Sequence, residues 1–308
     1  MEYVHHTTDF QFHNTVVSLG KFDGIHLGHR MLMDYMLSQK KKGLMPAAFT
    51  FSVDPGCLLS GKAGKVIYTE QEKRIRMEEA GVDIMISYPF NEETVKMEAE
   101  QFVRDILVKQ LDAKMIVTGS DFGFGYRRKG NVELLRRLSA EYGYELAVFD
   151  KLSVDGTIVS STAIRELLAE GKIEAANRLL LRPYFIYGEI VHGNEIGRTL
   201  GMPTANLYPP SWKLLVPNGV YVTKTYLDGR VCPGITNIGY KPTVGGEKWI
   251  GVETYLFDLD EDLYGKHICV ELYEYVRGER KFSSLEELKV QMYQDMEYGK
   301  RYLAGHGE

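Results

Sequence analysis

Cysteines and long apolar runs are both scarce in this sequence. Its three cysteines, Cys57, Cys232 and Cys269, lie far apart, and none stands in a Cys-x-x-Cys spacing. An odd number of isolated cysteines predicts reduced thiols and argues against a disulfide framework or a zinc site. No run of 18 apolar residues occurs, and residues 1–6 lack the basic-then-apolar order of a signal peptide. We therefore expect a cytoplasmic protein without a membrane span.

An excess of positive charge is also missing. The 308 residues carry 37 Lys and Arg against 42 Asp and Glu, which gives a net charge of −5. This balance argues against a general binder of nucleic acid or membrane surfaces, because both need a basic face. Anionic ligands would have to be bound at local sites. The length and the 44% of apolar residues are typical of a globular protein with roughly two domains.

Strand-like and helical runs alternate through the first half of the chain. The expected strands are residues 15–19, 46–51, 82–87, 114–118 and 145–149, and the expected helices are around 29–42, 69–80, 97–111, 134–142, 161–170 and 173–181. This alternation predicts a parallel sheet that is covered on both faces. In such sheets, ligands bind at the carboxyl ends of the strands, near the point where the strand order reverses.

A glycine-rich turn joins the first of these strands to its helix. Residues 20–29 read Gly-Lys-Phe-Asp-Gly-Ile-His-Leu-Gly-His. A turn of this kind exposes unpaired N–H groups and the positive end of the helix dipole, which suits a phosphate. His26 and His29 would add side-chain donors to a phosphoryl oxygen. A turn with two surface histidines is the alternative, and so short a motif leaves both interpretations open.

Two later segments carry residues that suit the same edge of the sheet. Residues 119–125 form a second glycine-rich loop that follows a strand. Residues 160–165, Ser-Ser-Thr-Ala-Ile-Arg, open a short helix with two serines, a threonine and a guanidinium. Hydroxyls and an arginine could bind a polyphosphate. Taken alone, however, a serine cap followed by an exposed arginine explains this segment better.

The second half changes character after Pro183. Aromatic and β-branched runs separated by glycine predict strands at 184–192, 219–227, 231–238, 252–258 and 267–277. Asp228-Gly229 predicts a hairpin, and short strands of this kind predict a small closed barrel. Ser283 and Ser284 begin a capped amphipathic helix that we expect to pack on it. We therefore predict two domains, residues 1–182 and 183–308.

One stretch of the second half is unusual. Gly193, Gly197 and Gly201 are spaced four apart and precede the tetrapeptide Pro-Thr-Ala-Asn that ends at Asn206. The phosphate loop of common nucleoside triphosphatases is absent, because no Gly-Lys-Ser/Thr follows. A glycine-rich flap over a nucleotide, with oxygen ligands for Mg²⁺ from Thr204 and Asn206, is physically reasonable. From spacing alone, a surface loop remains the better interpretation.

Taken together, the motifs resemble those of one known family along nearly the whole chain. They are residues 20–29, 120–125, 160–165, 198–206 and 237–243, followed by Glu253 and the Leu-Tyr-Gly at 263–265. The chain is similar in these segments, and in their order, to the bifunctional prokaryotic riboflavin kinases/FMN adenylyltransferases, also called FAD synthetases. Agreement at so many places in both halves makes chance resemblance remote.

The resemblance implies an α/β nucleotidyltransferase domain, with a Rossmann-like parallel sheet, in the first half. There an oxygen of the FMN phosphate would attack the α-phosphorus of ATP, and pyrophosphate would leave. His26, His29 and Arg165 would act in catalysis. The implied nucleotide-binding residues are Gly20, Phe22, Asp23, Gly24, Gly28, Ser161 and Thr162, and the implied flavin-binding residues are Asp121, Phe122 and Phe124.

For the second half, the resemblance implies a riboflavin kinase domain, a Greek-key-like β-barrel with a C-terminal helix. Glu253 would be the general base that activates the riboflavin 5′-hydroxyl toward the γ-phosphorus of ATP. Without the resemblance, Glu253 reads as an exposed strand carboxylate. Thr204 and Asn206 would hold Mg²⁺, and Arg277 would flank the flavin. Gly193, Gly197, Arg198 and Gly201 would cover the nucleotide.

The sequence departs from the family pattern at two places. Residues 52–56 read Ser-Val-Asp-Pro-Gly where the family usually has Pro-x-Pro or His-Pro, and Leu181 stands where glycine is usual. The departure at residues 52–56 leaves open whether the protein has both activities or only one of them. A flavin-sensing protein without turnover and an adenylyltransferase for another phosphorylated metabolite are further alternatives. We expect small-molecule substrates, no nucleic-acid or membrane partner, and leave weak self-association open.

Overall fold

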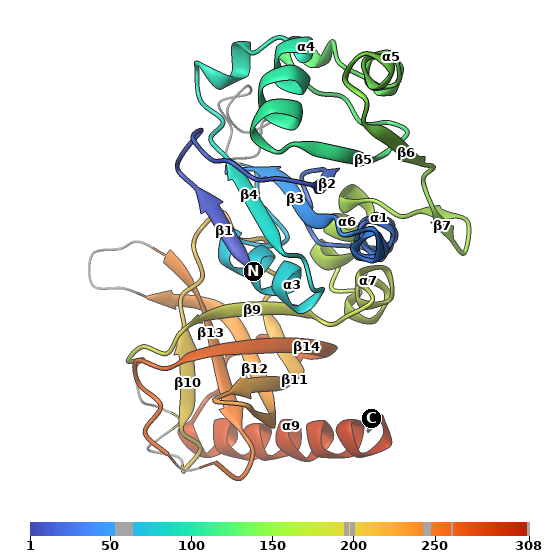
Figure 1. Ribbon diagram of the computed structural model, residues 1–308. Coiled ribbons are helices and arrows are strands. Elements are labelled where there is room, and N and C mark those ends of the chain that lie inside the picture. The colour runs from blue at the N-terminus through green and yellow to red at the C-terminus, as the bar shows by residue number, and fades with distance from the viewer. Residues whose placement is uncertain (53–63, 194–196, 198–200, 243–247, 260, 307–308) are drawn as a thin grey trace. The chain divides into compact units, whose positions relative to one another are not determined.

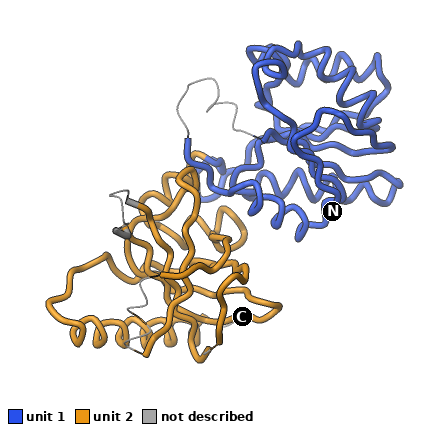
Figure 2. Tube along the Cα trace, turned by 90° about the vertical axis from the view of Figure 1, so that its left-hand side faces the viewer, with its two compact units in different colours: residues 1–161 blue, residues 162–308 orange. Residues whose placement is uncertain are grey.

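The computed structural model describes residues 1–52, 64–193, 197, 201–242, 248–259 and 261–306. The chain divides into two compact units, Met1–Ser161 and Thr162–Glu308 (Figure 2). The expected boundary between functional domains near residue 182 stays a prediction. Within the described residues, no helix combines the length and apolar character needed to cross a membrane. Neither Cys232 nor Cys269 forms a disulfide among the described residues, and Cys57 lies outside them.

A six-stranded parallel sheet forms the centre of the first unit (Figure 1). Its strands are β1 (Glu2–His5), β2 (Thr15–Leu19), β3 (Met45–Phe51), β4 (Ile84–Tyr88), β5 (Ala113–Gly119) and β6 (Glu145–Phe149), in the order β1-β4-β3-β2-β5-β6. The expected parallel α/β domain is therefore confirmed. The sequence does not indicate β1, because this short edge strand has no buried apolar run. The small hairpin of β7 (Ser153–Val154) and β8 (Thr157–Ile158) was not expected either.

The helices of this unit begin and end at the expected signals. They are α1 (Leu27–Ser38), η1 (Gln39–Lys42), α3 (Glu70–Glu79), η2 (Thr94–Lys96), α4 (Ala99–Gln101), η3 (Phe102–Gln110), η4 (Tyr126–Arg128) and α5 (Val132–Tyr142). Thr69 and Glu72 form the predicted capping box of α3, and Gly43 and Gly143 end their helices in the left-handed conformation. The expected helix 97–111 differs, because its second part is a π-helix.

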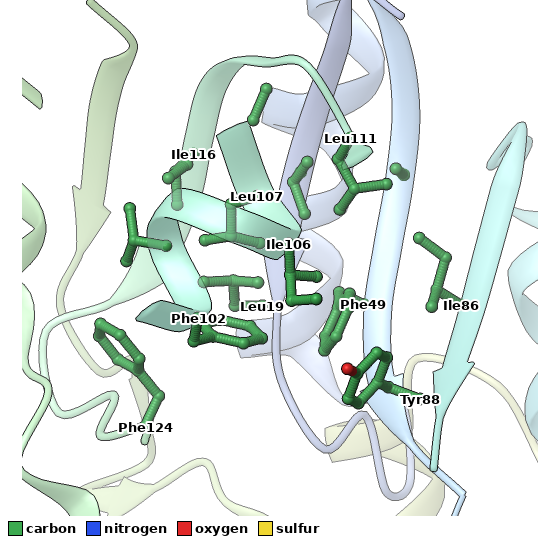
Figure 3. Close-up of a cluster of buried hydrophobic side chains, with 14 of the residues drawn as sticks. Leu19, Phe49, Ile86, Tyr88, Phe102, Ile106, Leu107, Leu111, Ile116 and Phe124 are labelled. Carbon is green, nitrogen blue, oxygen red and sulfur yellow. The ribbon is translucent and has the colours of Figure 1, made fainter. Parts of the chain in front are cut away.

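An apolar cluster beside the π-helix η3 stabilises the first unit (Figure 3). Phe102 packs edge-to-face on Phe49 of β3, with ring centroids 5.3 Å apart, and Leu107 is fully buried in the same cluster. Each fully buried side chain of this size contributes about 2 kcal/mol through the hydrophobic effect. The cluster also includes Leu19, the last residue of β2, and so holds the start of the first glycine-rich turn in place.

The strand order of the parallel sheet reverses between β2 and β5. These strands are neighbours, with Ser18 opposite Val117, although the chain passes through β3 and β4 between them. The turn at residues 20–26 follows β2, and the loop at 119–125 follows β5. Both expected ligand-binding segments therefore leave the carboxyl edge at the reversal point, where α/β sheets bind their ligands.

The second unit contains a six-stranded antiparallel sheet. Its strands are β9 (Tyr184–Glu189), β10 (Thr204–Leu207), β11 (Gly219–Leu227), β12 (Arg230–Pro242), β13 (Lys248–Leu256) and β14 (His267–Gly278), in the order β10-β13-β12-β11-β14-β9. Beyond β9, the amide of Val191 donates to the carbonyl oxygen of Asn206 at 3.0 Å, so the two edges of the sheet meet. β14 returns beside β11, the first strand of the β11-β12-β13 meander, as in a Greek key. The expected Greek-key-like barrel is confirmed.

The second unit also contains the helices α6 (Ser161–Ala169), which begins at the last residue of the first unit, α7 (Ile173–Leu180) and α9 (Leu285–Gly305). Ser284 caps α9 as predicted, and this helix packs on β11 and β12. The helix comes close to the sheet at Gly299, where an added Cβ would lie 2.9 Å from Ile235. The capped helix on the barrel is therefore confirmed.

The barrel interior contains a chain of buried hydroxyls. Thr223, Thr236 and Thr254 belong to the adjacent strands β11, β12 and β13 and are fully buried. The hydroxyl oxygen of Thr236 lies 3.0 Å from that of Thr223 and 2.9 Å from that of Thr254. Each hydroxyl is thereby satisfied without water. This explains why β11 shows only a partly apolar face in the sequence.

The C-terminal end of α7 carries backbone strain. Leu181 follows the helix with a φ of 59°, and its side chain is 51% exposed. Only glycine adopts this conformation without a steric cost from Cβ. The usual family glycine at this position has a clear physical reason, and its replacement here leaves the site strained.

We expect Leu181→Gly to raise the free energy of unfolding by about 0.5–1 kcal/mol, because relief of left-handed strain exceeds the added entropy of the unfolded chain. Urea unfolding measures the change. Gly143→Ala is the matched control, because Gly143 has a φ of 75° and no atom near its Cβ position. The control should destabilise the protein, and a loss of stability in Leu181→Gly would contradict the interpretation.

Candidate functional site

The turn between β2 and α1 is held by one aromatic side chain. Phe22 is fully buried and has a φ of 48°. Its ring lies 3.2 Å from the position a Cβ would take at Gly20, and 5.2 Å from the ring centroid of His29. The buried ring therefore supports the turn and the His29 ring. The nucleotide contacts expected of Phe22 and Gly20 stay predictions.

The carboxylate of Asp23 connects this turn to α3. Its Oδ1 accepts hydrogen bonds from the backbone amides of Ile67 at 2.8 Å and Tyr68 at 3.0 Å. Its backbone oxygen accepts a bond from the hydroxyl of Ser161 at 2.7 Å. A Cβ at Gly24 would lie 2.8 Å from Ile67, which explains the glycine there. Asp23 and Ser161, predicted to bind nucleotide, thus also hold the turn in shape.

The two histidines lie stacked at the start of α1. His26 is the N-cap residue, and its Nδ1 accepts a hydrogen bond from the amide of His29 at 3.3 Å. The two ring centroids are 3.8 Å apart, with 16° between the planes. A Cβ at Gly28 would lie 3.2 Å from the His26 ring, so the glycine lets the ring fold over the helix end. The predicted pair is therefore brought together at a helix N-terminus.

Burial keeps both imidazoles neutral in the absence of a ligand. Burial lowers the pKa of His26 to about 4. It also holds the pKa of His29 well below its usual range, with smaller contributions from the charges of His26 and Lys73. The Nδ1 atom of His29 is buried without a hydrogen-bond partner among the described residues. A bound anion would raise both pKa values and give this nitrogen a partner.

The loop after β5 divides into core and exposed parts. Phe124 is buried in the apolar cluster, and its ring stacks on that of Phe122 at 5.7 Å. Asp121 is exposed and forms an ion pair with Lys151 at 2.8 Å. Of the three predicted flavin contacts, Phe124 has a packing role in this structure. Asp121 and the half-buried Phe122 remain accessible to a ligand.

Thr162 and Arg165 lie in the first turns of α6. The division of the chain places both in the second unit, directly after Ser161. Their expected roles at the triphosphate stay predictions.

A second group of predicted residues meets on the barrel. Asn206 of β10 lies directly opposite Glu253 of β13, and Glu253 lies directly opposite Asn237 of β12. Residues that are directly opposite project from the same face of a sheet, with Cβ atoms about 5 Å apart. Thr204 lies on that face two residues before Asn206. The structure therefore brings Thr204, Asn206 and Glu253 together, as predicted.

The orientation of Asn206 suits a cation. Its Nδ2 donates to the carbonyl oxygen of Thr204 at 3.0 Å, so Oδ1 is the atom that remains for a ligand. A Cβ at Gly193 would lie 2.6 Å from the Asn206 amide, which requires glycine there. A carboxamide oxygen beside a threonine hydroxyl fits Mg²⁺, which prefers oxygen ligands and binds with substrate phosphates. Among the described residues, no group of three His, Cys, Asp or Glu forms a metal site.

The expected surface loop at residues 193–206 is only partly described. Thr204–Leu207 form strand β10, whose last three residues are buried, so this part is no surface loop. Met202 donates to the carbonyl oxygen of Gly197 at 2.8 Å, and Gly201 has a φ of 77°. Arg198 lies outside the described residues, as do positions 53–56 of the first departure from the family pattern.

Arg277 has a structural partner. Its Nε donates to Asp295 of α9 at 2.9 Å, its Nη2 forms a close ion pair with the same carboxylate, and its Nη1 donates to the carbonyl oxygen of Gly278. The side chain of Asp295 is almost fully buried. Arg277 therefore fixes α9 to β14, and the predicted flavin contact would compete with this ion pair.

Asn237 is a site residue to which the sequence assigned no role. It belongs to one of the family motifs, but its place beside Glu253 follows from strand register. No local pattern in the sequence indicates that register.

Each half of the chain matches a known protein family. The family model for FAD synthetase matches residues 9–163, and that for riboflavin kinase matches residues 180–303. Proteins described as bifunctional riboflavin kinase/FMN adenylyltransferase are similar over nearly the whole length. That of Buchnera aphidicola subsp. Acyrthosiphon pisum is 39% identical, covering 95% of each chain. That of Escherichia coli K12 is 35% identical, covering 95% of this chain and 94% of the relative.

A solved structure has the same fold throughout. It is described as a macrolide-efflux protein from Streptococcus pneumoniae and is 28% identical, with a TM-score of 0.85. The similarity covers 97% of this chain and 98% of that one.

The buried imidazoles make stability depend on pH. Because the pKa of His26 falls from 6.5 to about 4 on folding, the unfolded chain binds more protons between these values. Stability should therefore decrease as pH falls from 6.5 to 4, by up to about 3 kcal/mol from this residue. Urea unfolding at pH 7.5 and 5.0 tests this. His26→Gln should reduce the difference between the two pH values, whereas His13→Gln, at an exposed position, should leave it unchanged.

Proposed function

The chain belongs to the family of bifunctional riboflavin kinases/FMN adenylyltransferases, and we propose that its two sites each carry one of the two activities. The protein phosphorylates riboflavin to FMN with ATP and adenylylates FMN to FAD with release of pyrophosphate. The stacked imidazoles lie within the segment that matches FAD synthetase, and the row of Asn206, Glu253 and Asn237 lies within the segment that matches riboflavin kinase. This coincidence of geometry and family segment supports the assignment.

In the adenylyl-transfer site, a phosphate oxygen of FMN attacks the α-phosphorus of ATP. The bond from this phosphorus to the bridging oxygen breaks, and pyrophosphate leaves with the electron pair. This reaction needs positioned reactants and neutralised charge more than covalent catalysis. We assign these tasks to His26 and His29, which can donate hydrogen bonds to phosphate oxygens, and to the N-terminus of α1. Thr162 and Arg165 are proposed to bind the polyphosphate, and Asp121 and Phe122 the flavin.

In the kinase site, Glu253 takes the proton of the riboflavin 5′-hydroxyl. That oxygen attacks the γ-phosphorus, the bond to the bridging oxygen breaks, and ADP leaves. The hydroxyl of Thr204 and Oδ1 of Asn206 would hold Mg²⁺, which neutralises charge on the transferred phosphoryl group. Gly193, Gly197, Arg198 and Gly201 are proposed to cover the nucleotide.

We further propose that the enzyme acts in the cytoplasm on these small molecules alone. Cys232 and Cys269 form no disulfide among the described residues, which supports a reducing compartment. The net charge of −5 supports action without a nucleic acid or a membrane surface.

Two substitutions should separate the activities. With riboflavin and ATP, we expect Glu253→Gln to abolish FMN formation while supplied FMN is still converted to FAD. His29→Ala should accumulate FMN and lose FAD formation by about 100-fold or more, because a donor to the transition state is removed. Chromatography of the flavin products measures both.

The outcome also decides between the remaining alternatives. Wild-type protein that binds flavin but releases neither ADP nor pyrophosphate would be a sensor. Loss of both activities in both variants would contradict the assignment of one site to each reaction.

The close approach of Gly193 to Asn206 gives a separate test of the kinase site. Gly193→Ala places a methyl group against the Asn206 amide and should displace Oδ1, with a loss of about 100-fold in riboflavin phosphorylation and a higher Mg²⁺ requirement. Gly188→Ala is the control, because its Cβ would lie 3.5 Å from Leu207, an ordinary contact. Normal kinase activity and Mg²⁺ dependence in Gly193→Ala would remove Asn206 from the metal site.

A further inference from the structure

A buried lysine lies in the first turns of α3, beside the imidazole pair. Lys73 is only 8% exposed. Its one ion pair among the described residues joins Nζ to Oε2 of Glu70 at 3.9 Å, which is too long for a hydrogen bond. The other oxygen of Glu70 already accepts a bond from the hydroxyl of Tyr3 at 2.9 Å. A buried ammonium group is costly unless it is paired and hydrogen-bonded, so this pairing is incomplete.

The position of α3 directs this side chain toward the carboxyl edge of the sheet. The amides of Ile67 and Tyr68, just before the helix, are bound by Asp23 of the β2–α1 turn. α3 follows β3, so its N-terminus lies at the edge where the parallel strands end. Helical side chains point toward the N-terminus of their helix, and the contact of Lys73 with Glu70 agrees with this direction. The positive charge of Lys73 is also close enough to His29 to lower its pKa.

The nearby carboxylates are already engaged. Asp23 accepts two backbone hydrogen bonds, and Glu72 accepts one from the amide of Thr69 at 2.7 Å in the capping box. The imidazoles of His26 and His29 are neutral and cannot balance a positive charge. A buried ammonium, two neutral imidazoles and a helix N-terminus together suit an anion.

We infer that Lys73 is a further catalytic residue of adenylyl transfer and that its ammonium group contacts the triphosphate of ATP. This inference rests on the proposed location of that reaction at His26 and His29. As the bond from the α-phosphorus to the bridging oxygen breaks, negative charge accumulates on the departing pyrophosphate. A compact ammonium charge at that place stabilises the transition state without transferring a proton.

The test uses the full chain and measures FAD formation from FMN and ATP, with riboflavin phosphorylation measured on the same samples. We expect Lys73→Met to lower kcat/KM for FAD formation about 100-fold and to raise the KM for ATP. Lys73→Arg should recover part of this loss, because it keeps the charge. Glu70→Gln is the matched control, since it removes the ion-pair partner and should keep FAD formation near that of wild type. Riboflavin phosphorylation should not change in any of these variants.

The outcomes separate this inference from the proposed site. If His29→Ala abolishes FAD formation but Lys73→Met does not change it, the role of Lys73 is overturned and the site stands. If His29→Ala keeps full FAD formation, the site itself is wrong. A purely structural lysine predicts that Lys73→Met keeps the KM for ATP and that Lys73→Arg gives no recovery. Should Lys73→Met fail to fold by thermal unfolding, Lys73→Gln and Lys73→Arg provide the same comparison.

Discussion

The hydrogen bonding of Asp23 is the interaction on which the proposed adenylyl-transfer site depends. One oxygen of this side chain binds two successive amides before α3, and its own carbonyl oxygen binds Ser161 at the start of α6. Two segments far apart in the sequence are thereby joined to the turn that presents His26 and His29. These bonds hold the turn in the shape in which the two imidazoles stack.

The proposed kinase site depends on a different constraint, the register of antiparallel strands. Asn206, Glu253 and Asn237 come from three strands and meet only because each lies directly opposite the next. The first site therefore follows from a local turn at a helix N-terminus, whereas the second follows from pairing between distant segments. This difference explains why a short motif indicates the pair His26 and His29, whereas only strand register shows that Asn237 lies beside Glu253.

Most of the architecture could be predicted from the sequence, because periodicity, capping residues and glycine stops determine it locally. The capping box of Thr69 and Glu72 and the hairpin at Asp228-Gly229 are examples. The π-helix η3 and the short strand β10 could not, since tertiary packing decides both. Likewise, the resemblance implies flavin contacts for Phe124 and Arg277, but Phe124 packs in the core and Arg277 binds Asp295 of α9. Lys73 lies next to the capping glutamate Glu72 on a highly charged helix, so the sequence favours an exposed side chain at this position.

The hydroxyl chain inside the barrel fixes the register of β13, and with it the position of Glu253. Side chains alternate between the two faces of a strand, so sliding β13 by one residue would turn Thr254 outward and move the carboxylate of Glu253 into the closed interior. An unpaired carboxylate there, together with a broken hydroxyl chain, makes this misalignment strongly unfavourable. The interior hydroxyls thus select the strand alignment that places Glu253 on the same face as Asn206 and Asn237.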